Sequence, residues 1–335
     1  LNKLGDDLSL YSAETFKKRA ELFYRSGIAL DTALSLAHRS LEIAHTYPVG
    51  LIRYFPETGH IPAFVDEITR EKTTNKARGN LNTLIGLIKL KQGMPAESYI
   101  TEGLQVSQDN ETLANAGEYY SLTRAHQQAF DVYKKITMAV PEDTASFSKM
   151  QSAYAAWKPG LEGWEEQVSV LKTFWMEETL KQIRKEIINI ATPDFASALV
   201  NLKGEPVNRE SLRNKIIVLD FWATWCIPCM HEMPYLQNVY DQYKNDPDVV
   251  FMVINSGSKN TIDDARGWWG NKKFTFPVYF NNDPMIGEKL KFNVIPATYI
   301  IDKTGNIRFK TIGFEGAVIE RKMKAAIQLL KEGEM

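Results

Sequence analysis

The residues with the clearest capacity for chemistry are two cysteines separated by two positions. The chain has 2 Cys, and both lie in the stretch Cys226-Ile-Pro-Cys229. An apolar run typical of a strand precedes them and a helical pattern begins at Cys229, so the pair is expected at a strand-to-helix turn. There, free backbone N–H groups and the positive end of the helix dipole favour a thiolate. We predict that Cys226 is an exposed nucleophile and that Cys229 is a shielded thiol close enough to form a disulfide with it.

A cysteine pair with this spacing also occurs as half of a zinc site, and that alternative predicts bound zinc. The sequence holds no second cysteine pair, and the nearby histidine is His231. Because a structural zinc site needs four ligands, the redox interpretation is favoured and no metal ligand is predicted.

Two acidic residues flank the cysteines at spacings that bear on proton transfer. Asp220 lies in the apolar run before Cys226, and Glu232 follows Cys229 by three residues, on the same helix face. A shielded thiol must lose its proton before it attacks, so a nearby base is required. If both carboxyl groups lie in a poorly solvated pocket, at least one should titrate high and the pair should show joint apparent pKa values. The alternative for Glu232 is a solvated carboxylate favoured by the helix dipole.

The elements that must position these residues follow from the periodicity after residue 191. Two strand-like runs enclose the helix that carries Cys229, which makes a βαβ unit with parallel strands. Further strands and a closing helix predict an α/β fold with a central mixed sheet and helices on both faces. The expected strands are 216–221, 249–254, 276–280, 297–301 and 306–311, and the expected helices are 229–243 and 317–331.

The first 190 residues show helical periodicity and almost no strand signal, so they are predicted to form a separate all-α domain. The spacing of Leu113, Ala116, Gly117, Tyr120 and Tyr133 is similar to that of a tetratricopeptide repeat, with an irregular helical domain as the alternative. The domains are expected at 1–190, including a long linker helix, and 191–335. The expected helices are 20–24, 29–44, 81–90, 113–129, 130–139 and 164–190.

Composition excludes some functions and leaves others open. The chain has 335 residues, 44% of them hydrophobic, and a formal net charge of −1 at pH 7, so nothing favours nucleic acid as a partner. No run approaches the roughly 18 apolar residues that span a bilayer. The chain begins with Leu1 instead of Met, so we expect that processing or cloning removed an N-terminal segment; whether that segment was a signal peptide or a lipid anchor stays open.

The stretch from Val218 through Asp220 to Cys229 resembles the thioredoxin superfamily, and its surroundings resemble the TlpA/ResA-like branch. Glu232-Met-Pro is similar to the acidic position of the active-site helix, and Val294-Ile-Pro-Ala-Thr298 to the cis-proline loop. The resemblance covers about 191–335 and implies a thioredoxin fold. It also implies a thiol–disulfide oxidoreductase in which Cys226 attacks and Cys229 resolves, with no cofactor beyond their disulfide. Many TlpA/ResA-like proteins have a neutral residue in place of Asp220.

The resemblance further implies how substrate is bound and where the protein works. Pro296 is expected to be cis, and Trp222, Trp225 and Ile295 are expected to supply an apolar rim for a protein thiol or disulfide substrate. Reduction of protein disulfides in the bacterial periplasm or cell envelope is implied, with electrons from a membrane-linked donor. The helical domain is expected to hold a partner or to self-associate.

Two other functions stay open. A disulfide oxidase or isomerase would use the same residues at another reduction potential. A helical-repeat scaffold with a secondary dithiol would keep its biological effect without Cys226.

Overall fold

The computed structural model describes residues 10–46, 52–55, 59–62, 66–270 and 272–333. Contacts divide the chain into two compact units, Leu1–Ser169 and Val170–Met335. We expected the helical part to end at residue 190, whereas this division falls inside helix α8 (Trp164–Glu186). Most of α8, residues 170–186, is therefore grouped with the sheet, and Ile183 lies in that unit's core.

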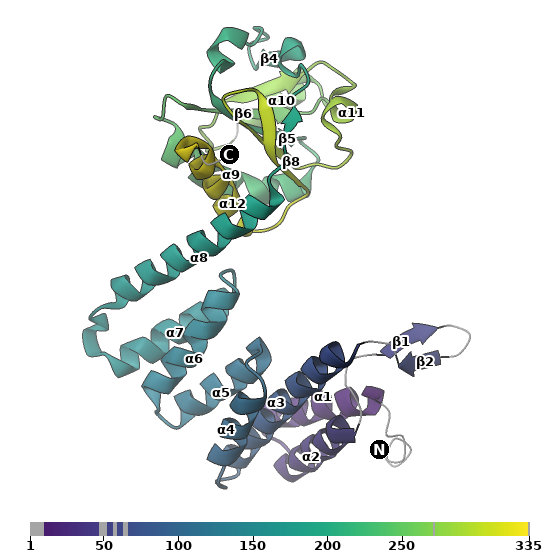
Figure 1. Ribbon diagram of the computed structural model, residues 1–335, viewed down its shortest axis with the longest axis vertical. Helices are drawn as coiled ribbons and strands as arrows, with labels where there is room; N and C mark the ends of the chain where they lie inside the picture. Colours follow the sequence, from purple (N-terminus) through teal and green to yellow (C-terminus); the bar gives the residue numbers. More distant parts are fainter. Residues whose placement is uncertain (1–9, 47–51, 56–58, 63–65, 271, 334–335) are drawn as a thin grey trace. The chain divides into compact units, whose positions relative to one another are not determined.

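The first unit consists of helices that pack against their neighbours in sequence, as expected for an all-α domain (Figure 1). A short hairpin of strands β1 (Ile52–Phe55) and β2 (Gly59–Pro62) interrupts them, and the sequence patterns did not predict it. The helices are α1 (Leu10–Ser26), α2 (Leu30–Thr46), α3 (Glu67–Lys91), α4 (Glu97–Val106), α5 (Asn110–Leu122), α6 (His126–Ala139) and α7 (Thr144–Trp157).

The helix expected over 113–129 is two helices, and this prediction was wrong. Arg124 adopts a φ of 60°, in the left-handed region that a continuing right-handed helix does not allow, so the chain turns between α5 and α6. The small residue Gly117 lets the pair approach closely, because a Cβ there would lie 2.7 Å from the ring of Tyr133. This contact fits the tetratricopeptide-like spacing, which stays a prediction.

The second unit is built on a mixed seven-stranded sheet of order β3-β9-β8-β5-β6-β7-β4. Strands β5, β6 and β7 run parallel, and the remaining neighbours pair antiparallel. The strands are β3 (Ile190–Ala191), β4 (Leu199–Asn201), β5 (Ile216–Trp222), β6 (Val249–Asn255), β7 (Val278–Asn281), β8 (Ala297–Ile301) and β9 (Asn306–Ile312). The predicted mixed sheet is confirmed.

Helices cover both faces of this sheet (Figure 1), and the central strand β5 is buried along its whole length. Successive side chains of a strand point to opposite faces. Val218 and Trp222 accordingly join the core under α9 (Ile227–Tyr243) and α12 (Val318–Glu332), while Leu219 and Phe221 join the core under α11 (Ile286–Leu290). Asp220 lies two positions from both Val218 and Trp222, so its side chain is on the same face as theirs and points toward α9. A further helix, α10 (Ile262–Trp269), follows β6 in the sequence.

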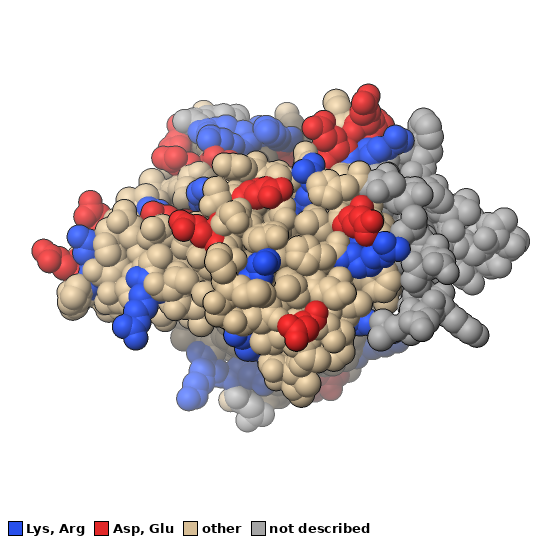
Figure 2. Space-filling view, turned by 90° about the horizontal axis from the view of Figure 1, so that it is seen from below, with Lys and Arg blue, Asp and Glu red and all other residues tan. Residues whose placement is uncertain are grey.

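The surface agrees with the near-neutral charge of the chain. In Figure 2, Lys and Arg side chains are interspersed with Asp and Glu over the face in view. Within the described residues, no helix is both long enough and apolar enough to cross a membrane.

Candidate active site

The two cysteines form a disulfide at the start of α9, with a Cα–Cα distance of 5.3 Å. Cys226 is the N-cap of the helix, and its Sγ accepts a hydrogen bond from the backbone N–H of Cys229 at 3.2 Å. The helix begins at Ile227, two residues before the expected start, and Pro228 lies in its first turn, where a missing N–H is tolerated. The predicted orientation of first-turn N–H groups toward the sulfur is confirmed.

The expected exposure of Cys226 is wrong for the disulfide state. Cys226 is 3% exposed and Cys229 is 1% exposed. The loop before β8 covers the pair, and the carbonyl oxygen of Ile295 lies 3.7 Å from Cys226 Sγ. Both sulfurs are thus enclosed by protein, with Cys226 the more accessible of the two.

The loop that covers the sulfurs contains a cis peptide bond between Ile295 and Pro296, as the resemblance implied. The carbonyl of Pro296 accepts a hydrogen bond of 2.8 Å from the N–H of Gly313, which ties the loop to the end of β9. The side chain of Val294, which precedes Ile295 in this loop, is 53% exposed. The backbone of this loop is therefore held next to the disulfide with its outer side open to solvent.

The two tryptophans expected at the rim of the site lie in different environments. Trp225 is 51% exposed, and its Nε1 donates a hydrogen bond of 2.9 Å to the carbonyl of Ser258. Trp222 is 0% exposed, so its expected place at the rim is wrong. As the last residue of β5 it points into the core, where its ring lies 4.8 Å from that of Trp268.

A hollow of about 400 Å³ opens beside the exposed Trp225. It extends between the turn before the cysteines, the loop after β6 and the segment around α11. Its lining is mostly apolar side chains with two serines. The lining residues are Trp225, Ser256, Ser258, Pro284, Ile286, Gly287, Phe292, Asn293, Val294 and Ile295.

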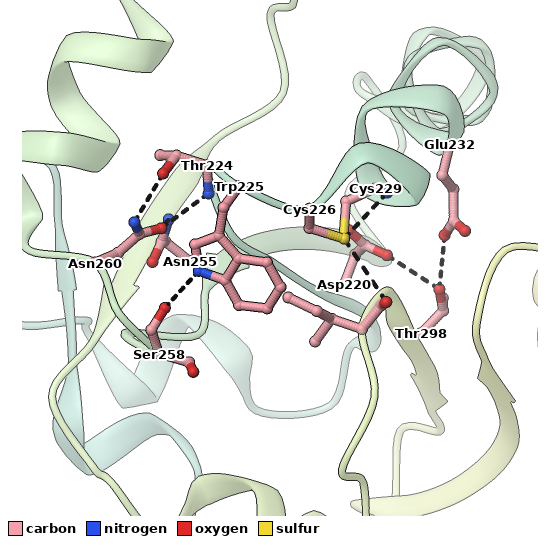
Figure 3. The surroundings of a disulfide bond; sticks show 11 residues. Asp220, Thr224, Trp225, Cys226, Cys229, Glu232, Asn255, Ser258, Asn260 and Thr298 are labelled. Carbon is pink, nitrogen blue, oxygen red and sulfur yellow. Dashed lines mark hydrogen bonds between the residues drawn. A yellow bond between two sulfur atoms is a disulfide. The ribbon is translucent and has the colours of Figure 1, made fainter.

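The two acidic residues come together at the hydroxyl of Thr298, near the disulfide (Figure 3). Asp220 and Glu232 are each 2% exposed. The hydroxyl Oγ1 of Thr298 lies 3.0 Å from Asp220 Oδ2 and 3.1 Å from Glu232 Oε1. Glu232 is therefore a buried carboxyl group and not the solvated one of the alternative interpretation.

Burial raises the pKa of both carboxyl groups. It raises the pKa of Asp220 to about 6, and the polar groups of Glu232 and Thr298 next to it oppose this rise. It raises the pKa of Glu232 to about 9, with a further contribution from the charge of Asp220. The expectation that at least one of the pair titrates high is met, and near neutral pH the pair holds one proton.

A polar network that the sequence analysis missed holds the turn before Cys226. The side-chain oxygen of Asn260 accepts hydrogen bonds from the N–H of Thr224 at 2.8 Å and from Asn255 Nδ2 at 3.0 Å. Its Nδ2 donates to Thr224 Oγ1 at 2.7 Å (Figure 3). Asn260 thus ties the loop after β6 to the residues that lead into the disulfide.

Thr298 is the other residue that the sequence analysis did not assign. It was noted as part of the cis-proline loop but given no role. The sequence signal for Thr298 was its place in a strand, two positions after Pro296. Its position opposite the inward-facing Asp220 becomes clear only once the register of the two strands is known. Within the described ranges, no group of three or more His, Cys, Asp or Glu side chains could hold a metal ion.

Comparison with known proteins agrees with this site. The Redoxin family matches residues 189–327. ResA of Geobacillus kaustophilus, a thiol-disulfide oxidoreductase, is 31% identical over 122 residues, which are 36% of this chain and 67% of that protein. The thioredoxin-like protein YneN of Bacillus subtilis is 32% identical over 123 residues, which are 36% of this chain and 69% of that protein. ResA of Oceanobacillus iheyensis is 32% identical, but this chain spans 60% of its length.

Solved structures that are similar include StoA from Bacillus subtilis, with 23% identity and a TM-score of 0.33 over 39% of this chain and 98% of that one. A thiol:disulfide interchange protein from Chlorobium tepidum has 22% identity and a TM-score of 0.35 over 42% of this chain and 97% of that one.

The sheet unit and its Cys226–Cys229 disulfide define a thioredoxin-superfamily domain. The chain belongs to the ResA-like family of thiol-disulfide oxidoreductases and is a redox enzyme that exchanges thiols and disulfides with protein substrates.

Proposed function

We propose that the enzyme works as a reductase of protein disulfides, with Cys226 as the nucleophile and Cys229 as the resolving thiol. The observation that carries this proposal is the buried acidic pair, of which Glu232 lies one helical turn after Cys229 on α9 and Asp220 lies on β5. Negative charge near a dithiol disfavours the thiolate, because like charges repel in a poorly solvated site. A reduced form that is disfavoured in this way gives up its electrons more readily.

The reaction would proceed in two exchanges. The Cys226 thiolate attacks one sulfur of the substrate disulfide, that S–S bond breaks, and the leaving substrate thiolate takes up a proton. The Cys229 thiol then passes its proton to the acidic pair and attacks Cys226 Sγ. The mixed disulfide breaks, the second substrate thiolate leaves with a proton, and two electrons have moved to the substrate.

Asp220 and Glu232 are assigned the proton transfer in the second exchange. Cys229 is 1% exposed, so bulk water has little access to its proton. An ionised Asp220 is a base of suitable strength, since its pKa is raised to about 6. A base with a pKa near the working pH transfers protons most effectively.

Substrate would bind along the loop of Ile295 and Pro296. An extended chain can pair with exposed backbone groups of such a loop. Trp225 and the hollow beside it offer apolar contact, whereas the buried Trp222 does not. In the reduced enzyme, the Cys226 thiol can also donate to the Ile295 carbonyl, which is already close to it.

The setting of the reaction is proposed on the resemblance to TlpA/ResA-like proteins. The enzyme would act outside the cytoplasm, in the bacterial periplasm or cell envelope, and receive electrons from a membrane-linked donor. We further propose that residues 1–190 form a tetratricopeptide-like domain that holds a partner or self-associates, carried before the redox domain at 191–335.

A second function is favoured by one observation. The hydrogen bond from the Cys229 N–H to Cys226 Sγ, at the positive end of a helix, stabilises a thiolate and hence the reduced form. An oxidase or isomerase would exploit this effect. The acidic pair and the helix terminus thus act in opposite directions on the reduction potential.

Trapping the mixed disulfide tests the assigned roles. The variant Cys229→Ser, mixed with a peptide that contains one disulfide, should accumulate a covalent adduct at Cys226. The matched variant Cys226→Ser should form none, and the wild type should release reduced peptide. An adduct with Cys226→Ser, or full turnover by Cys229→Ser, would contradict the proposal.

A further inference from the structure

The hydroxyl of Thr298 lies between two buried carboxyl groups that belong to different elements (Figure 3). Thr298 stands opposite Asp220 in the paired strands β8 and β5, so their side chains share one face of the sheet. Glu232 reaches the same hydroxyl from α9. Since Thr298 is 1% exposed and both carboxyl groups are 2% exposed, the three groups must satisfy one another.

A threonine hydroxyl carries a single proton and can donate to only one carboxyl group. The second carboxyl group must therefore donate to the hydroxyl if both short contacts are to be hydrogen bonds. That condition is met when one member of the pair is ionised and the other is protonated. Two carboxylates would leave one of them without a donor, which is costly in a buried site. Two protonated groups could still satisfy both contacts, because a neutral carboxyl group keeps an acceptor oxygen. That state requires a pH below the pKa of Asp220, which burial raises to about 6.

The contacts also indicate which member keeps the proton. Glu232 Oε2 is buried and has no hydrogen-bond partner within the described residues. An unpartnered oxygen is much more costly on a carboxylate than on a neutral carboxyl group. Glu232 is thus the neutral member, donating to Thr298, and Thr298 donates to an ionised Asp220.

We propose that Thr298 is a positioning residue that holds Asp220 and Glu232 in a singly protonated state, with the proton on Glu232. The inference rests on the proposed function for its consequence in exchange. An ionised Asp220 can then accept the S–H proton of Cys229 as the Cys229–Cys226 bond forms and the bond from Cys226 to substrate breaks. The departing substrate thiolate takes up that proton, which restores the singly protonated pair.

Other charges near the pair do not replace this effect. The charge of Glu315 acts on Glu232 and raises its pKa further. Glu315 is itself paired at 2.8 Å with Lys322 on α12, which also lies 3.8 Å from Glu186. A substitution at Thr298 leaves these charged groups, and their effect on the pKa of Glu232, unchanged.

Carboxyl titration by ¹³C NMR of oxidised protein labelled at Asp and Glu tests the inference without an activity assay. In the wild type at pH 7, one carboxyl group of the pair should be protonated and the other ionised. Thr298→Val keeps the side-chain shape but removes the hydroxyl. It should narrow the pH range of the singly protonated state by about 1 pH unit, the order expected for a hydrogen bond to a charged group. Thr298→Ser should retain the wild-type range.

Thr311→Val is the matched control, since Thr311 is a buried threonine paired with Thr298 on the next strand. It should leave both titrations unchanged. The inference would be overturned if both carboxyl groups were ionised at pH 7 in the wild type, or if Thr298→Val titrated like the wild type. Should Thr298→Val fail to fold, the wild-type titration and that of Thr298→Ser decide the matter.

The proposed function fails by a different result. If Asp220→Asn combined with Glu232→Gln left the pH dependence of thiol–disulfide exchange unchanged, the pair would have no part in proton transfer. The titrations of Thr298→Val would still report whether the hydroxyl controls the protonation of the pair.

Discussion

Replacing Glu232 with glutamine should stabilise the oxidised protein by an amount that grows with pH. The pKa of Glu232 is raised to about 9 in the folded protein from an ordinary value of 4.5. An acid with a raised pKa contributes stability at low pH, and this contribution is lost as pH rises toward the folded pKa. Between these values the unfolded chain has lost a proton that the folded chain keeps. Glutamine does not ionise, so the variant does not lose stability in this way as the pH rises.

The magnitude follows from the pKa values of the pair. Above the value of about 6 for Asp220, the folded wild type holds one proton that the unfolded chain lacks. Its free energy of unfolding should then fall by about 1.4 kcal/mol for each pH unit relative to Glu232→Gln. From pH 6 to pH 9 the advantage of the variant should grow by about 4 kcal/mol as an upper value. Glu232 is 2% exposed, so solvent screening takes little from this figure.

Guanidinium unfolding of the oxidised proteins at several pH values measures the effect, with tryptophan fluorescence as the signal. Glu288→Gln is the matched control, because Glu288 is exposed on α11 and its replacement should cause no pH-dependent difference. The reasoning would be refuted if wild type and Glu232→Gln gave parallel curves of unfolding free energy against pH. Glu232 would then be ionised in the folded state throughout.

Three further substitutions test the packing around the site and in the helical unit. Asn260→Ala should lower the free energy of unfolding by about 1–3 kcal/mol and speed amide hydrogen exchange at Thr224. The control Asn282→Ala, at an exposed position, should do neither, and equal exchange rates at Thr224 in the two variants would contradict this. Gly257→Ala should destabilise the protein more than Gly204→Ala. Both glycines have a positive φ, but only at Gly257 would an added Cβ lie 2.6 Å from a backbone oxygen, that of Asn281. Equal chemical-denaturation midpoints for the two variants would refute this clash. Gly117→Ala should lower the calorimetric unfolding temperature of the helical unit, because overpacking against Tyr133 costs about 1–3 kcal/mol of stability. The control Gly267→Ala, where an added Cβ meets open space, should not destabilise the unit that contains it.

The dithiol and its setting could be predicted from the sequence because their determinants are local. The strand run before Cys226, the helical pattern after it and the position of Pro228 all lie within one short stretch. The same holds for the approach of Glu232 to Cys229, which depends only on helix periodicity. The mixed sheet followed from the order of strand and helix patterns.

Burial was harder to predict, since it depends on segments distant in sequence. Cys226 was expected to be exposed, but the loop of Ile295 covers it. Trp222 was placed at the rim, but Trp268 of α10 encloses it. The role of Thr298 was missed for the same reason, because 66 residues separate it from Glu232. The β1–β2 hairpin was not predicted because its two strands have only four residues each, too few to show a clear alternating pattern.

The reduction potential of the Cys226–Cys229 couple shows whether the enzyme can act as a reductase of protein disulfides. Purified protein would be equilibrated against dithiol buffers of known potential, and the thiols trapped and counted. We expect a strongly reducing value, near the roughly −270 mV of thioredoxin. A value near the roughly −120 mV of DsbA would contradict the reductase and make the enzyme an oxidant of protein thiols.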